Sequence, residues 1–314
     1  MAIKDSGFYS LQFDHNTNLQ VFYNLYTPES TTILGTIMLL HGMQEHSGRY
    51  DDFASFLARN GFIVLTYDHP GHGSTAKEPK DLGFFHEDQP GEILIQTAIE
   101  ITQFLHEKYN DLPHFIISHS LGSFITRNVI QRIGDDFEGV VLIGTGHAMK
   151  GSSIGTSFLG LLNKVVPNSK STFMNDKFAQ INNRKFKDEP NHEDLNWLSL
   201  NKENRDNYLN DELCGIDFTD NAFYGAAQVT LWGSGKDWYK KVPNHLSFLL
   251  LSGQDDPIGD FGKGVLQSVE ELKEHGVKEV KYHLYPQLRH ELLNEDNKKE
   301  VYVEILDWLL MKIK

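Results

Sequence analysis

The strongest chemical signal in this 314-residue sequence is a serine at the centre of a short motif of small residues. The motif Ser118-His119-Ser120-Leu121-Gly122 follows the apolar run 115–117 and opens a helical pattern. A sharp turn from strand to helix strains the central serine and exposes its hydroxyl, as a nucleophile requires. The turn needs small residues two positions away on each side, and Ser118 and Gly122 satisfy this, although glycine is usual at the first. The motif therefore predicts acyl-transfer chemistry at Ser120.

A carboxylate follows a later apolar run. A serine nucleophile needs a base that is oriented by an acid, and in this topology the acid comes after the serine and before the histidine. Residues 253–257 read Gly-Gln-Asp-Asp-Pro and directly follow the run 246–251. We favour Asp256 because the Gly-x-x-Asp-Pro spacing places it past the turn, and we keep Asp255 as the alternative.

The expected base is His290, which follows the last predicted strand, 279–285. The loops that carry the serine, the acid and this histidine all lie at the carboxyl edge of the predicted sheet, where open α/β sheets place their sites. His119 lies beside the serine, but consecutive side chains on a tight turn point apart. We therefore assign the role of base to His290.

Acyl transfer also requires N–H donors for the oxyanion. The expected donors are the backbone N–H of Leu121, directly after the nucleophile, and that of Met43, in the loop after the third strand. Gly42 allows the backbone of that loop to turn. His41 and His46 lie in the same loop, but no matching carboxylate or third histidine motif accompanies them, so we expect no metal there.

The segments that must position these residues alternate between apolar runs and helical patterns. Alternation of this kind predicts an α/β fold, with a mostly parallel sheet and helices on both faces. The expected strands are residues 9–13, 19–26, 36–40, 62–67, 115–117, 140–143, 246–251 and 279–285. The expected helices are a first one with Tyr50, Phe53 and Leu57 on one face, then 93–106, 121–133 and a last one with apolar residues from Tyr302 to Ile313.

The stretch 148–241 breaks this alternation. It is polar and rich in Asn, Asp and Lys, and its most apolar piece is 158–166. Because long insertions in compact domains usually serve function, we interpret it as a cap on a core made of residues 1–147 and 242–314. The apolar piece can line an acyl tunnel, touch a membrane surface or pack the cap against the core.

Composition excludes several classes of protein. The 43 acidic and 29 basic residues give a formal net charge of −14, which argues against a non-specific nucleic-acid binder and against purely electrostatic adhesion to an anionic membrane. The single cysteine, Cys214, can form neither an internal disulfide nor a thiolate zinc cluster. Without a signal-peptide core or a run of about 18 apolar residues, the expected location is the cytoplasm.

Three motifs together resemble the monoacylglycerol lipase and lysophospholipase group of serine α/β-hydrolases. The first is HGxxEHxxRY, matched at His41, Gly42, Glu45, His46, Arg49 and Tyr50. The second is D-x-x-G-x-G, matched at Asp68, Gly71 and Gly73. The third is the elbow GHSMG, from which Ser118 and Leu121 depart. The cap segment 196–219 is also similar to caps of bacterial lysophospholipase-like members.

The resemblance implies an eight-stranded hydrolase fold, no cofactor and ester hydrolysis by Ser120, His290 and Asp256, with the amides of Met43 and Leu121 as the oxyanion hole. Monoacylglycerol or lysophospholipid is the implied substrate. A short-chain carboxylesterase is the alternative, and a C–C hydrolase, a peptidase or an inactive binding protein stays open. For Glu45, Arg49 and Tyr50 we favour a role in holding the start of the following helix over contact with substrate.

Overall fold

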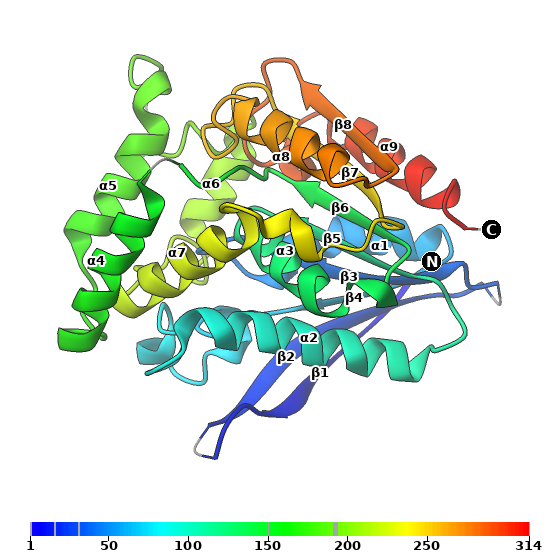
Figure 1. Cartoon of the computed structure of the whole chain (residues 1–314), viewed down its shortest axis with the longest axis horizontal. Helices are drawn as coiled ribbons and strands as arrows, with labels where there is room; N and C mark the ends of the chain where they lie inside the picture. The colour runs from blue at the N-terminus through cyan, green and yellow to red at the C-terminus, as the bar shows by residue number, and fades with distance from the viewer. Residues whose placement is uncertain (1, 16, 31, 150, 191–193, 314) are drawn as a thin grey trace.

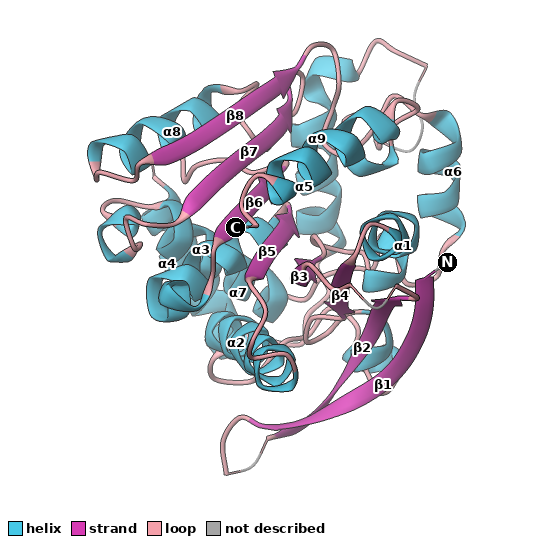
Figure 2. Ribbon diagram, turned by 90° about the vertical axis from the view of Figure 1, so that its right-hand side faces the viewer, coloured by secondary structure: helices cyan, strands magenta, loops and turns pink. Residues whose placement is uncertain are grey.

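One twisted sheet runs through the protein, and helices cover both of its faces (Figures 1 and 2). The computed structural model describes residues 2–15, 17–30, 32–149, 151–190 and 194–313. Within these residues, eight strands form the sheet in the order β1-β2-β4-β3-β5-β6-β7-β8. The strands are β1 (Ala2–Gln12), β2 (Asn18–Pro28), β3 (Gly35–Leu40), β4 (Phe62–Tyr67), β5 (His114–His119), β6 (Gly139–Ile143), β7 (Ser247–Gly253) and β8 (Glu279–Tyr285).

The direction of the strands determines where the loops meet. β1 and β2 pair antiparallel, β2 also runs antiparallel to β4, and the other neighbours are parallel. β3 to β7 are buried along their whole length, as their continuous apolar runs predict. In register, Leu40 pairs with Ser118, His119 with Ile143, and Gly253 with Tyr285. The loops after β3, β5, β7 and β8 therefore leave the sheet at one edge.

The helices form two layers and an additional group. The α-helices are α1 (Asp51–Arg59), α2 (Pro90–Lys108), α3 (Leu121–Ile133), α4 (Ser152–Val165), α5 (Thr172–Asn183), α6 (Lys202–Asn210), α7 (Asp220–Ser234), α8 (Lys263–Glu274) and α9 (Lys298–Leu310). Short 3-10 turns are η1 (Ser47–Tyr50), η2 (Gly73–Thr75), η3 (Pro79–Asp81), η4 (Gly134–Asp136), η5 (Arg184–Phe186), η6 (Trp238–Lys241) and η7 (Leu292–Asn294). α1 and α9 pack on one face of the sheet and α2, α3 and α8 on the other, each with its own apolar core.

The chain between β6 and β7 contains α4 to α7, and α4 and α5 project from the layers at the left of Figure 1. Its last helix returns to the core: the side chain of Asn128 in α3 donates to the carbonyl of Val229 in α7 at 2.9 Å. Gly91 in α2 donates its N–H to the side chain of Gln228 at 3.1 Å. Among the described residues, none of the helices is both long enough and apolar enough to cross a membrane.

The α/β architecture is as predicted, with three local differences. β1 begins at Ala2, earlier than expected, because most of its side chains are exposed and give no apolar signal, while backbone pairing with β2 forms the strand. α8 has no counterpart among the expected helices, since Gly264 and Ser268 contribute to its buried face and weaken the apolar pattern. α9 ends at Leu310, so Ile313 packs on the core from beyond the helix.

Candidate active site

Ser120 sits on the turn between β5 and α3. Its backbone has φ 51° and ψ −120°, a conformation that is costly for a residue with a side chain. The Ser120 N–H donates to the carbonyl of Ile143 at 3.0 Å, and the Ser120 carbonyl accepts from the N–H of Ser123 at 2.8 Å. A Cβ on Gly122 would lie 2.5 Å from the His41 carbonyl oxygen. Glycine at 122 therefore allows α3 to approach the loop after β3 closely enough to form the turn.

The two residues before Ser120 also fit this turn. Ser118, where glycine is usual, is fully buried, and its hydroxyl lies 3.5 Å from the Val141 carbonyl. His119 points away from the Ser120 hydroxyl: its Nδ1 lies 3.2 Å from Glu45 Oε1, and its Nε2 lies 3.2 Å from the His290 carbonyl. Both ring nitrogens of His119 thus face oxygen acceptors, which leaves neither free to accept a proton from Ser120.

The structure brings Ser120, His290 and Asp256 into one hydrogen-bonded chain. Ser120 Oγ lies 2.8 Å from His290 Nε2, and His290 Nδ1 lies 2.9 Å from Asp256 Oδ2. Asp256 is fully buried, and His290 and Ser120 are 2% and 9% exposed. Because an ionised carboxylate only accepts hydrogen bonds, Nδ1 carries the proton of the neutral ring and Nε2 is free to accept from the serine. This arrangement can remove a proton from the Ser120 hydroxyl.

Asp255 lies elsewhere. Its carboxylate pairs with Lys185 on the surface, and its side chain is 31% exposed. The carboxylate of Asp256 is held by the N–H of Ile258 at 2.9 Å and by the hydroxyl of Ser252 at 3.3 Å. The turn after β7 therefore directs Asp256 towards His290 and Asp255 towards Lys185.

The loop after β3 passes directly beside the serine. Met43 and Ser120 line one small cavity, and a Cβ on Gly42 would lie 3.0 Å from the Ser120 Cβ. Leu121 is the first residue of α3, and the N–H groups of a first helical turn have no acceptor within the helix. The backbone near Met43 and the amino end of α3 thus flank Ser120 from two sides.

A buried ionic network fixes this loop. Arg49 donates to Glu45 Oε2 at 2.7 Å and to the two carboxylate oxygens of Glu291 at 2.6 and 2.8 Å. Glu45 Oε1 accepts from the Gly42 N–H at 2.5 Å and from the Tyr50 hydroxyl at 2.8 Å. Glu45 and Arg49 therefore connect the loop after β3 to the loop that carries His290. This role is wider than the one we expected, which was to hold the start of the following helix.

The charges of this network shift several pKa values. Burial is the largest single influence on the Glu45 and Glu291 carboxyls and raises their pKa values, but Arg49 and His119 together lower them by more, so that both pKa values lie below their usual range. Burial is the largest single influence on His119 and lowers its pKa, but the Glu45 and Glu291 carboxylates and the His290 carbonyl together raise it by more, and the net shift is upward. At neutral pH the network thus contains two carboxylates that share one guanidinium.

Sequence reasoning missed the contribution of Glu291 and of the inserted segment to this network. Glu291 directly follows His290, but its partner Arg49 lies 242 positions earlier in the chain. Asn204 of α6 accepts from Arg49 Nη2 at 2.9 Å and donates to Glu291 Oε2 at 2.6 Å. Within the sequence, only the adjacency of Glu291 to His290 hinted at such a role.

The histidines of the loops after β3 and β4 already have backbone partners. His41 Nδ1 lies 2.7 Å from the Gly42 carbonyl, and its Nε2 accepts from the His69 N–H at 3.0 Å. His72 Nδ1 lies 3.0 Å from the Pro70 carbonyl. Burial lowers the pKa of His69 to about 3 and that of His72 to about 4. These neutral rings hold loops together, and His41 has no nitrogen free for a metal.

Residues of the inserted segment cover the serine. Phe178, Trp197, Leu198 and Tyr208 line the same cavity as Ser120, and this cavity measures only about 30 Å³. The Trp197 ring centroid lies 5.1 Å from that of His290. Ligand pockets usually measure about 300–1,000 Å³. The volume beside Ser120 holds about one water molecule, so an acyl chain can enter only after these residues move.

The sheet order, the strained serine between β5 and α3, and the histidine and aspartate loops define a serine α/β-hydrolase fold. The chain belongs to the family described as serine aminopeptidase, S33 (Hydrolase_4), which matches residues 31–297. Monoacylglycerol lipases are among the proteins to which the chain is similar.

Relatives and solved structures agree with this family. The chain is 29% identical to the monoglyceride lipase of Mus musculus over 156 residues, 49% of this chain and 50% of the relative. It is 30% identical to the monoacylglycerol lipase of Mycolicibacterium smegmatis over 129 residues, 40% and 42% of the two chains. The match thus spans about half the length of the curated relatives or less. A carboxyl esterase from Bacillus coagulans superposes with a TM-score of 0.87 at 26% identity, covering 98% of this chain and 99% of that one.

Proposed function

We propose that this chain is a serine hydrolase that cleaves carboxylic esters through an acyl-enzyme on Ser120, with monoacylglycerol as its substrate. The observation that carries the proposal is the hydrogen-bonded chain from Ser120 through His290 to Asp256, with distances of 2.8 and 2.9 Å. The relatives named as monoglyceride lipases and the carboxyl esterase with the same fold support ester hydrolysis.

In the acylation step, His290 Nε2 takes the proton of the Ser120 hydroxyl while Oγ attacks the ester carbonyl. Asp256 accepts from Nδ1, which fixes the ring and stabilises the imidazolium that forms. We assign the oxyanion hole to the backbone N–H groups of Met43 and Leu121. Collapse of the tetrahedral intermediate breaks the bond to the alcohol, which leaves with the proton from His290 Nε2.

In the second half of the cycle, water replaces the alcohol. His290 Nε2 takes a proton from the water as its oxygen attacks the acyl carbonyl, and the released proton returns to Ser120 Oγ when the acid departs. Protein groups supply all of these proton transfers, so the proposed cycle requires no cofactor.

The boundary of the cap at residues 148–241 belongs to this proposal. The exposed apolar face of α4 supports a lipid substrate: Ile154, Phe158, Leu161 and Val165 recur along one side of the helix and are 59–78% exposed. Leu159 packs inwards on the core instead. The net charge of −14 repels an anionic surface, so the contact of this face would be with neutral lipid or micelles. A cytoplasmic location remains a prediction.

A short-chain carboxylesterase is the second candidate. The cavity of about 30 Å³ beside Ser120 favours it, because a small ester needs less displacement of Trp197 and Phe178 than a long acyl chain does. Lysophospholipid differs from monoacylglycerol in its charged headgroup, and the acidic pair Glu45 and Glu291 does not favour an anionic phosphate nearby.

The test is a side-by-side rate measurement with the purified chain. Monoacylglycerols of increasing acyl length, lysophosphatidylcholine, p-nitrophenyl butyrate and an amino-acid arylamide serve as substrates, and Ser120→Ala is the control. We expect long-chain monoacylglycerol to dominate and Ser120→Ala to be inactive on every ester. A maximum at butyrate would replace the lipase assignment with the short-chain esterase, and preferential cleavage of the arylamide would contradict ester hydrolysis as the main activity.

A further inference from the structure

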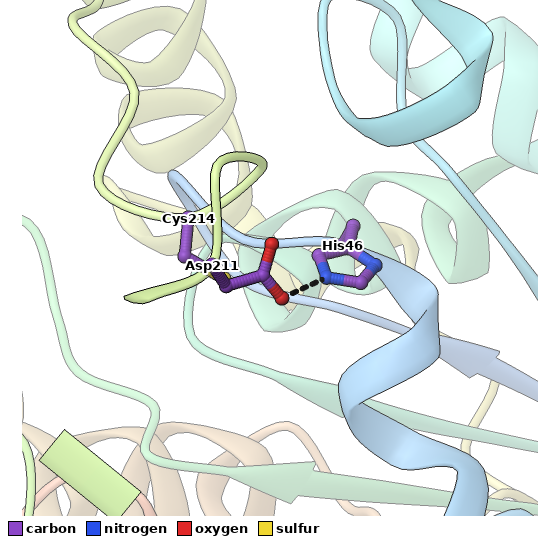
Figure 3. A group of neighbouring side chains, drawn as sticks. All are labelled: His46, Asp211 and Cys214. Atoms are coloured by element: carbon purple, nitrogen blue, oxygen red, sulfur yellow. Dashed lines mark hydrogen bonds and ion pairs between the residues drawn. The ribbon is translucent and has the colours of Figure 1, made fainter. Parts of the chain in front are cut away.

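Three potential metal ligands meet between the loop after β3 and the inserted segment (Figure 3). They are a ring nitrogen of His46, a carboxylate oxygen of Asp211 and the sulfur of Cys214, which all lie within 4.8 Å of one another. His46 Nε2 lies 2.9 Å from Asp211 Oδ2. Asp211 and Cys214 lie 165 positions or more after His46 in the sequence, so the spacing around His46 gave no sign of them.

Cys214 makes the cluster more than an ordinary ion pair. The residue is only 9% exposed, and no hydrogen bond of its sulfur is found among the described residues. Burial raises the pKa of the Cys214 thiol, although Arg49 opposes the shift. A bound cation deprotonates a coordinating thiol outright.

The donor set selects the kind of cation. One imidazole, one carboxylate and one thiolate suit a borderline ion such as Zn²⁺, whereas Mg²⁺ and Ca²⁺ prefer oxygen ligands alone. Tetrahedral Zn²⁺ with bonds of about 2.0–2.3 Å separates its ligand atoms by about 3.3–3.6 Å. The present spacing is 2.9 Å between His46 Nε2 and Asp211 Oδ2 and at most 4.8 Å between any two of the three ligand atoms, which brackets this range.

The backbone holds both halves of the cluster in place. The Gly215 N–H donates to the Gln44 carbonyl at 2.9 Å, and the Tyr208 hydroxyl donates to the same carbonyl at 3.0 Å. Gln44 Nε2 donates to the carbonyl of Ile216 at 2.8 Å. The Cys214 N–H closes a turn onto the carbonyl of Asp211 at 3.0 Å. Ligands from two distant segments are thus presented together by fixed loops, which lowers the entropy cost of binding.

The surrounding charges also favour a cation. Arg49 is the nearby positive group, and its guanidinium is shared by the carboxylates of Glu45 and Glu291. Asp211 adds a third negative charge. The three carboxylates of Asp211, Glu45 and Glu291 and the one guanidinium of Arg49 together carry a charge of −2.

We propose that His46, Asp211 and Cys214 form a Zn²⁺ site that clamps the inserted segment onto the loop after β3. Binding displaces the thiol proton of Cys214 into solvent. The proton that His46 Nε2 shares with Asp211 moves to Nδ1, which gives up the 3.2 Å contact from the Gly48 N–H. Because of these costs, we expect affinity on the order of micromolar, weaker than that of structural zinc sites.

The consequence of the clamp rests on the proposed function. An ester can reach Ser120 only after residues of the inserted segment move away from the cavity of about 30 Å³. Zn²⁺ that ties Asp211 and Cys214 to His46 opposes this movement. We therefore expect Zn²⁺ to inhibit hydrolysis reversibly, with a chelator restoring the rate.

The first test reads metal binding without activity. Chelator-treated full chain is titrated with Co²⁺, which reports a thiolate ligand by a sulfur-to-metal charge-transfer band, and Zn²⁺ then displaces the Co²⁺. We expect one ion per chain, no band in Cys214→Ser, and at least about tenfold weaker Zn²⁺ binding in His46→Asn. The asparagine oxygen at 46 replaces Nδ1 as acceptor for the Gly48 N–H, so the local turn is kept while Nε2 is lost.

The matched control is His283→Asn, which breaks a surface histidine–carboxylate pair of 2.8 Å with Glu304 and leaves the cluster intact. Binding that is equal in wild type and Cys214→Ser, or a Co²⁺ spectrum without the band, would overturn the site. Zn²⁺ that binds at the cluster but slows wild type and Cys214→Ser equally would overturn the clamp. If no form of the chain hydrolyses esters, the proposed function fails, while the Co²⁺ band still decides the site.

Discussion

Replacing Arg49 by methionine removes the guanidinium shared by two buried carboxylates. The Arg49 side chain is 10% exposed, and those of Glu45 and Glu291 are 3% exposed. Removing one partner of a buried ion pair costs about 3–5 kcal/mol, because the remaining charge stays buried without compensation. At about 2.1 cal/mol/K per residue, the unfolding entropy of 314 residues is about 0.66 kcal/mol/K. The melting temperature should therefore fall by about 5–8 °C.

The same substitution should change how stability depends on pH. In the wild type, the pKa values of Glu45 and Glu291 lie below the usual 4.5. Pairing with Arg49 therefore adds to the free energy of unfolding above pH 4.5, and this addition is lost as the pH falls through the lowered pKa values. In Arg49→Met, the strongest influence that lowers both pKa values is removed while burial still raises them, so the destabilisation grows as the pH rises above the usual value. The deficit in unfolding free energy should be largest at pH 7.5 and smaller at pH 5.

Urea denaturation of wild type and variant at the two pH values measures this difference directly. The matched control is Arg132→Met, because Arg132 pairs with Glu92 on the surface, where both side chains are about one-third exposed. Exposed pairs contribute about 0–1 kcal/mol. If Arg49→Met costs no more than Arg132→Met, or if its deficit is the same at both pH values, the buried network does not carry the charges that we assign to it.

Three further predictions concern the site and the cap. Asp256→Asn should lower kcat by about 10⁴-fold, because it favours the wrong tautomer of His290. The control Asp255→Asn should leave kcat within about twofold, because the partner of Asp255 is a surface lysine. Equal losses of kcat in steady-state assays would contradict the choice of Asp256. Gly42→Ala should lower activity about 100-fold, since the added Cβ would lie 2.6 Å from Glu45 Oε1. The control Gly155→Ala has open space around the added Cβ and should keep full activity. A fully active Gly42→Ala would refute the close packing of the loop after β3. Phe158→Ser should weaken sedimentation with neutral phospholipid vesicles about tenfold, and unchanged binding would exclude α4 as the lipid contact.

Sequence patterns were most informative where one segment decides the outcome. The runs that became β3 to β7 are apolar without interruption because both faces of these strands are covered, so they stood out from the polar chain around them. Ser120 was predicted because its motif directly follows one of these runs, and His290 because it lies in the loop after the last predicted strand, 279–285. The choice between Asp255 and Asp256 depended on the spacing of a single turn, whose backbone directs the two neighbouring carboxylates to opposite sides.

Features that depend on distant segments could not be read from the sequence. Glu291 gains its partner Arg49 only when the loops after β3 and β8 meet at one edge of the sheet. His46 lacks a ligand in its own neighbourhood and finds Asp211 after the inserted segment has folded over it. The helices of that segment gave little signal, because α6 is mostly polar and α4 exposes most of its apolar side chains to solvent.

Covalent labelling of the intact chain by a fluorophosphonate tests whether Ser120 is an activated nucleophile. This reagent phosphonylates a serine whose proton is taken by a nearby base, and peptide mass spectrometry identifies the modified residue. We expect one adduct on Ser120, none on Ser120→Ala, and much slower labelling of His290→Ala. An unmodified Ser120 after prolonged exposure of folded protein, or labelling that is equally fast in His290→Ala, would contradict a serine nucleophile activated by His290.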